Sequence, residues 1–163
     1  MTAERRDVAL CSTAEGDGAV DHRPNFTGVW QVVAAKSHIP GRPFARMIAK
    51  IDHREPRLAQ HVIVLDTSGG RQQLRVEFLT NGEESVNSVG AGQMRTRASW
   101  KNEELLIESW LTAGERMSHF RDFWTLSTSG DTLTMEHRDD DLAGQVAVLE
   151  RAPDAQAEFQ PES

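Results

Sequence analysis

Hydrophobic and polar residues alternate with a period of two along most of the chain, as in β-strands whose two faces meet different environments. In one example Leu74, Val76 and Phe78 share a face, and the charged residues between them share the other. No window keeps an apolar stripe with the 3.6-residue period of a helix, so the pattern predicts an all-β protein. The predicted strands are residues 28–35, 45–53, 58–66, 73–78, 84–89, 94–100, 104–112, 117–127, 132–138 and 145–151.

Turn-forming residues separate these runs at short intervals, for example at Ser68-Gly69-Gly70 and at Asn81-Gly82. They recur about every 8–14 residues, which is typical of antiparallel hairpins. A meander of about ten strands avoids open edges most simply by closing on itself. We therefore expect an antiparallel up-and-down β-barrel, with a β-sandwich as the alternative. Residues 37–44 contain two prolines and are expected to form a loop, with room for a short helical turn.

The chain has 163 residues, enough for one domain with its own core. Residues 1–24 and 153–163 are rich in Ala, Glu, Asp and Gln and carry little periodic apolar content. Such segments bury too little apolar surface to offset the entropy of ordering, so we expect flexible tails there. The barrel domain is expected over residues 25–152.

Charge and cysteine content limit the classes of binding partner and the cellular compartment that we expect for this chain. The formal net charge is −7 at pH 7, so nucleic acid and anionic membrane surfaces are disfavoured as partners. No segment approaches the roughly 18 apolar residues of a membrane span. Cys11 stands alone, which precludes an intrachain disulfide, and its surroundings lack a secretory leader pattern. We expect a cytoplasmic protein, and the oligomeric state stays open.

The first strand begins with Gly28-Val29-Trp30, and two later hairpins read SWKNEELLIESW and FRDFWTLSTSGDTLTMEH. A Gly-x-Trp at the start of strand one followed by a β-meander resembles the calycin superfamily, which includes lipocalins and fatty-acid-binding proteins. The later hairpins are similar to those of small bacterial lipocalin-like proteins. This resemblance covers about residues 25–151 and implies a calycin-like barrel that binds a small molecule.

The resemblance also implies roles for Trp30 and Arg151. In calycins the tryptophan closes one end of the barrel and packs against an arginine of the last strand, which here is Arg151. The chain departs from fatty-acid-binding proteins in two respects. It contains no tyrosine, so the Arg-x-Tyr pair that holds a ligand carboxylate is missing, and the proline-containing residues 37–44 do not suit their two capping helices. A conventional fatty-acid carrier is therefore disfavoured.

Polar residues that interrupt apolar strands are the candidates for a site in the barrel. On 117–127 one face carries His119, Arg121 and Phe123, and both faces mix apolar with ionisable residues. On the preceding strand Glu108 is in step with Trp110. A buried charge must be paired, so such a cluster would orient a polar ligand end or move a proton. The alternative is that these charges face solvent.

Two functions follow from this reading. The first is binding of a small apolar or amphipathic molecule in the cavity. The alternative is a cofactor-free enzyme of cyclase, isomerase or hydrolyase type acting on a natural-product intermediate, with His119 and Glu108 as the acid–base pair. The ligand-binding candidates are Arg121, Trp110, Phe123, Arg97, Arg75 and Phe78.

Neither a metal nor a cofactor is expected. The histidines on predicted strands show no metal-ligand spacing and have no cysteine nearby; they are His53, His61, His119 and His137. The acidic run Asp139–Asp141 lacks the glycine and the distal glutamate of a calcium loop, so it is interpreted as a solvated turn. No phosphate-binding loop or dinucleotide fingerprint occurs.

Overall fold

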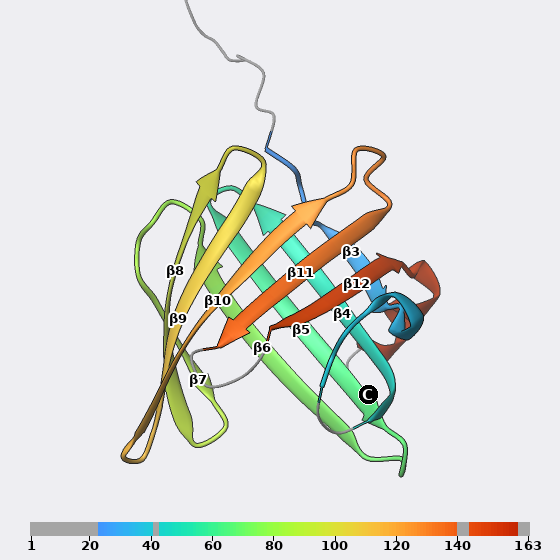
Figure 1. Cartoon of the computed structure of the whole chain (residues 1–163), viewed down its shortest axis with the longest axis horizontal. Helices are drawn as coiled ribbons and strands as arrows, with labels where there is room; N and C mark the ends of the chain where they lie inside the picture. Colours follow the sequence, from blue (N-terminus) through green and yellow to red (C-terminus); the bar gives the residue numbers. More distant parts are fainter. Residues whose placement is uncertain (1–22, 41–42, 140–143, 160–163) are drawn as a thin grey trace, which may run out of the picture.

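The structure is a computed structural model that describes residues 23–40, 43–139 and 144–159 (Figure 1). Within these residues the chain forms β3 (Gly28–Val32), β4 (Phe44–Arg54), β5 (Arg57–Asp66), β6 (Arg71–Leu79), β7 (Ser85–Val89), β8 (Gly92–Lys101), β9 (Glu104–Ala113), β10 (Arg116–Leu126), β11 (Thr132–Asp139) and β12 (Gln145–Arg151). Two short 3-10 helices, η1 (Ala34–Lys36) and η2 (Pro153–Phe159), complete the described elements. Each predicted strand corresponds to one of these ten, so the all-β prediction is confirmed.

All the described strands belong to one sheet in the order β6-β5-β4-β3-β12-β11-β10-β9-β8-β7. Neighbours in this order run antiparallel, and the first strand pairs with the last, placing Trp30 opposite Arg151. The sheet curls so that β9, β10 and β11 face β4, β5 and β6 across the molecule (Figure 1). This confirms the predicted antiparallel up-and-down barrel, since the sandwich alternative would require two separate sheets.

The barrel is incomplete between β6 and β7, which are the two edges of the sheet. Side chains of β7 bridge this seam in place of a backbone ladder. The amide of Asn87 accepts a hydrogen bond from the Glu77 N–H at 3.0 Å and donates one to the Glu77 carbonyl at 2.9 Å. The hydroxyl of Ser85 accepts a hydrogen bond from the Leu79 N–H at 3.1 Å. These contacts satisfy edge groups that would otherwise invite pairing with another chain.

Trp30 occupies the position that the resemblance implies. Its side chain is fully buried, its Nε1 donates to the Phe26 carbonyl at 3.0 Å, and the Arg151 guanidinium carbon lies 4.2 Å from the ring centroid. Gly28 is required by this packing, because its φ is +149° and a Cβ there would lie 2.3 Å from Nη1 of Arg151. The predicted Trp30–Arg151 contact is confirmed.

Alternation along each strand divides the side chains between the interior and the outer face. On β4, Ala49 and Ile51 enter the main core, whereas Ile48 points outward. Ile48 is nevertheless buried, because Ala155 of η2 and Ile63 of β5 pack with it in a second small cluster. The core therefore lies inside the barrel, with a satellite cluster beneath η2.

The packing of η2 differs from the expectation of a flexible tail over 153–163. Ala155 is 1% exposed, and Phe159 packs against the same cluster. The ordered chain therefore continues past the end of β12, because Ile48 and Ile63 offer an apolar outer surface that the tail covers. Residues 1–22 and 160–163 lie outside the described residues, as do two aspartates of the predicted acidic turn, Asp140 and Asp141.

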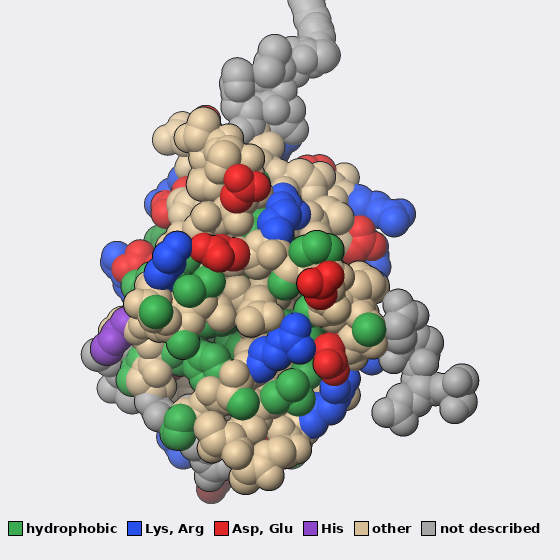
Figure 2. Space-filling model, turned by 90° about the vertical axis from the view of Figure 1, so that its right-hand side faces the viewer, with side chains coloured by type: hydrophobic (Ala, Val, Ile, Leu, Met, Phe, Trp, Pro, Cys, Tyr) green, Lys and Arg blue, Asp and Glu red, His purple; other side chains and the backbone are tan. Residues whose placement is uncertain are grey.

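The surface carries both signs of charge. Figure 2, which looks at the side of the molecule on the right of Figure 1, shows acidic and basic side chains interspersed with small hydrophobic patches. Within the described ranges, no helix has the length and hydrophobicity needed to cross a bilayer.

Candidate functional site

The interior of the barrel contains a cavity of about 350 Å³ between β5–β6 and the facing strands β8–β12. Most of its wall is apolar, and Phe78 is the one predicted ligand-binding residue on it. Trp124 is part of this wall, and the Phe26 ring meets its indole edge-on at 5.5 Å between centroids. The other main apolar lining residues are Leu74, Val76, Met94, Ile107, Phe120 and Met135.

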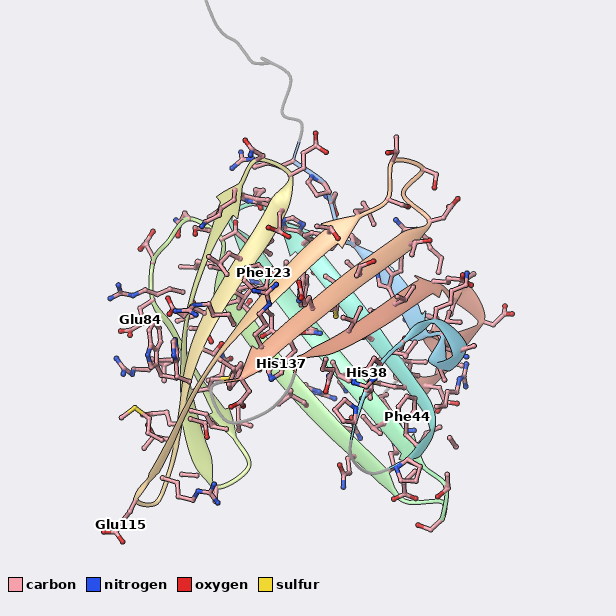
Figure 3. The ribbon with its side chains drawn as sticks, viewed as in Figure 1. His38, Phe44, Glu84, Glu115, Phe123 and His137 are labelled. Carbon is pink, nitrogen blue, oxygen red and sulfur yellow. The ribbon has the colours of Figure 1, made fainter. Side chains whose placement is uncertain are left out.

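Asp122 and His137 form a polar pair within this wall. They are cross-strand partners on β10 and β11, and Nδ1 of His137 lies 2.8 Å from Oδ1 of Asp122. Both side chains are partly buried, with exposed fractions of 27% for His137 and 23% for Asp122. The hydrogen bond to Asp122 outweighs burial and raises the pKa of His137, and the charge of Asp139 acts in the same direction. His137 lies near the carboxyl end of β11 (Figure 3).

Four uncharged polar side chains complete the lining. Thr96 and Ser109 are buried, and their hydroxyls lie 3.2 Å apart in a cross-strand pair of β8 and β9. Gln60 of β5 and Gln145 of β12 lie on the same wall. The cavity is thus an apolar chamber in which a few polar groups can orient a ligand, as is usual for small-molecule sites.

The predicted cluster of His119, Glu108 and Arg121 forms, but on the outer face. Nε2 of His119 lies 2.6 Å from the Glu108 carboxylate, and Nε of Arg121 lies 3.5 Å from the same oxygen. Of the two positions that the sequence left open for this cluster, lumen or solvent, the structure shows the outward-facing one. Ser109 and Phe120 line the cavity, so their sequence neighbours on β9 and β10 must point away from it.

Large neighbours shield this outer cluster. The Trp110 ring stacks on the His119 ring with 5.3 Å between centroids, and Arg95 lies over the indole at 5.7 Å. The charges therefore avoid the cost of entering the apolar interior, since they are paired at a partly hydrated surface. An acid–base role for His119 and Glu108 stays a prediction, and the cavity is not available to it.

The remaining predicted ligand-binding residues also lie outside the cavity. Phe123 is on the outer face of β10, where Arg138 covers its ring at 5.0 Å. Arg97 is the cross-strand partner of Glu108 on the same outer face. Arg75 lines an outer groove that adjoins the cavity at Gln60 and Val76, and its Nε lies 3.4 Å from Nε2 of His61.

A second polar cluster closes one end of the barrel. The Glu55 carboxylate accepts hydrogen bonds from His53 at 2.5 Å, Thr80 at 2.8 Å and Trp100 at 3.3 Å. Nδ1 of His53 accepts the backbone N–H of Phe26 at 3.2 Å, which places the imidazole proton on Nε2. Burial alone would raise the pKa of the Glu55 carboxyl, but the hydrogen bonds from these three side chains outweigh it and lower the pKa. These groups satisfy one another, so the cluster is a structural plug.

The sequence contained a signal for the Asp122–His137 pair. Asp122 lies between Phe120 and Trp124 on the more apolar face of its strand, and an acidic residue in that position requires a partner when it is buried. Identifying His137 as that partner requires the register between β10 and β11, which the sequence alone does not state.

Across the described stretches of the chain, no group of three or more His, Cys, Asp or Glu side chains is arranged to hold a metal ion.

The fold, with its interior cavity, is that of a calycin-like β-barrel. No protein-family model and no curated protein sequence matches the chain. Solved structures with the same fold include secretory abundant heat soluble protein 4 from Ramazzottius varieornatus, at a TM-score of 0.55 and 12% identity over 78% of this chain and 95% of that chain. Lipid binding protein 8 from Caenorhabditis elegans matches at a TM-score of 0.55 and 10% identity over 78% and 95% of the two chains. A protein described as the REP1-NXSQ fatty acid transporter matches at a TM-score of 0.54 and 9% identity, over 77% of this chain and 95% of that chain.

Proposed function

We propose that this protein binds a small, largely apolar molecule inside the barrel. The observation that carries the proposal is the cavity of about 350 Å³, whose wall is apolar except for a few polar groups. Ligand pockets in proteins have volumes of roughly 300–1,000 Å³, so this chamber suits a small ligand. The contacts would come from aromatic and sulfur-containing side chains such as Phe78, Phe120 and Met135.

The structural neighbours support the same proposal. Two of them are described as a fatty acid transporter and a lipid binding protein. The alternative of a cofactor-free enzyme gains no support from these neighbours, and its proposed acid–base pair lies on the outer face. The narrower likeness to small bacterial lipocalin-like proteins and a cytoplasmic location both remain predictions from the sequence.

Titration with diphenylhexatriene, a hydrocarbon fluorophore without polar atoms, tests the proposal. We expect saturable binding with a rise in fluorescence, because the probe would leave water for an apolar chamber. Met135→Trp should fill the cavity and weaken binding by about tenfold or more, corresponding to at least about 1.4 kcal/mol.

Thr134→Trp is the matched control. It places the same indole on the same strand, and Thr134 faces outward because Met135 lines the cavity. This variant should bind the probe as the parent protein does. Absence of saturable binding, or equal weakening by both substitutions, would contradict the proposed function. If the probe binds as expected, native mass spectrometry of protein purified from its own host would identify a bound natural molecule.

A further inference from the structure

The charges on the cavity wall are few and already matched. The ionisable side chains among its lining residues are Asp122 and His137, and the lining includes neither lysine nor arginine. The arginines considered for a ligand carboxylate, Arg75, Arg97 and Arg121, all lie outside this chamber. A protonated His137 beside an ionised Asp122 sums to zero charge. The chamber therefore offers hydrogen bonds to a ligand but no net positive charge.

The geometry of the pair leaves one ring nitrogen for a ligand. Nδ1 of His137 is engaged with Asp122 at 2.8 Å, and no described residue forms a hydrogen bond with Nε2. The ring packs at a tilt against Phe120, with 5.0 Å between centroids, which holds its plane. An imidazole with one nitrogen that no described residue engages, in an apolar chamber, can serve as a single-point anchor for a polar group.

We propose that the cavity selects apolar molecules with one uncharged polar end, a hydroxyl or a carbonyl, bound at Nε2 of His137, and discriminates against the matching carboxylates. This inference rests on the proposed function and adds the chemical class of the ligand. A carboxylate would enter an apolar chamber whose one candidate cation, His137, is already neutralised by Asp122. Its desolvation free energy would therefore be poorly compensated. An alcohol or a carbonyl carries a much smaller hydration cost and gains a hydrogen bond.

This selectivity would separate the protein from a neighbour described as a fatty acid transporter. The test compares 1-decanol with decanoate as competitors of diphenylhexatriene at pH 7.5. Both have the same carbon chain, so the difference between them reports the polar end. We expect 1-decanol to displace the probe at a concentration lower by about tenfold, the factor that about 1.4 kcal/mol represents.

A double variant locates the selectivity. Asp122→Leu with His137→Leu removes both partners, so neither is left buried and unpaired. It should keep diphenylhexatriene binding while losing about tenfold in affinity for 1-decanol. The control is Glu136→Gln with Arg138→Gln, which removes an ion pair of 3.0 Å on the outer face at the two positions flanking His137. This control should bind both molecules as the parent protein does.

The outcomes separate the two proposals. If the parent protein does not bind diphenylhexatriene, the proposed function fails. If the hydrocarbon binds but decanoate competes as well as 1-decanol or better, the function stands and the selectivity for uncharged ends is overturned. If 1-decanol is preferred but the double variant and its control behave alike, the assignment of His137 is overturned.

Discussion

At the scale of single residues, the Asp122–His137 pair makes stability depend on pH. The hydrogen bond to Asp122 raises the pKa of His137 above its ordinary value of 6.5. A group whose pKa is higher in the folded state stabilises the fold most when it is protonated in both states. Its contribution is therefore fully present below about pH 6.5 and is lost as the pH rises through the folded-state pKa.

We expect Asp122→Asn to lower the free energy of unfolding most at acidic pH. The difference from the parent protein should be large at about pH 5.5 and should shrink towards pH 9, where His137 has lost its proton. Urea unfolding at a series of pH values measures this difference. Asp131→Asn, in an exposed turn, is the control and should show a small difference that does not vary with pH. A pH-independent loss for Asp122→Asn would refute the linkage.

At the scale of elements, the seam between β6 and β7 is held by side chains. The two hydrogen bonds between the Asn87 amide and the backbone of Glu77 take the place of one ladder pair. Such isolated bonds at a sheet edge are individually weak, because each exchanges with water at a net gain of about 0.5–1.5 kcal/mol. The seam is therefore where the barrel should open most readily.

Asn87→Ala should loosen this seam locally. We expect the backbone amide of Glu77 to exchange its hydrogen about tenfold faster, since its acceptor is gone and about 1.4 kcal/mol of protection is a factor of ten. Amides in the β4–β5 ladder should be unaffected. Asn81→Ala, in the turn that joins the same two strands, is the control for loss of an asparagine nearby. Equal protection of Glu77 in the parent and in Asn87→Ala would show that the seam does not depend on this side chain.

At the scale of the whole molecule, closure depends on the contact between the first and last strands. Trp30 and Arg151 are cross-strand partners, and the guanidinium covers the buried indole. Truncating a fully buried tryptophan leaves a cavity and removes its transfer free energy.

We expect Trp30→Ala to lower the free energy of unfolding by about 3–5 kcal/mol. Chemical denaturation measures this change. Trp110→Ala is the comparison, because that indole lies on the outer face against His119 and should cost less. Equal midpoints for the parent protein and Trp30→Ala would contradict a closing role for Trp30.

Local features of the sequence were sufficient to predict the strands and the pairing of the first strand with the last. Alternation with a period of two and recurrent Gly and Asn turns depend on a few adjacent residues, so they can be recognised from the sequence alone. Gly28 and Trp30 belong to the same category, since the resemblance supplied their partner Arg151. The cavity residue Phe78 was also found, because its strand has one clearly apolar face.

Tertiary structure decided which side of each mixed strand faces inward. The two faces of β10 each combine apolar and ionisable residues, so composition alone did not distinguish the lumen from the surface. Only the closed sheet turns Phe120 and Asp122 inward and leaves His119 and Arg121 outside. The packing of residues 153–159 also depends on the tertiary structure, because the apolar surface that η2 covers is assembled from Ile48 and Ile63 on two different strands.

The candidate site has the same origin. Asp122 and His137 are 15 positions apart in the sequence and meet because β10 and β11 pair in one particular register. A shift of a single residue would send one of them to the opposite face. The sequence by itself therefore determined the strands and how they close, since those follow from neighbouring residues. The contents of the cavity were decided by strand register and barrel closure, which depend on contacts between residues far apart in the chain.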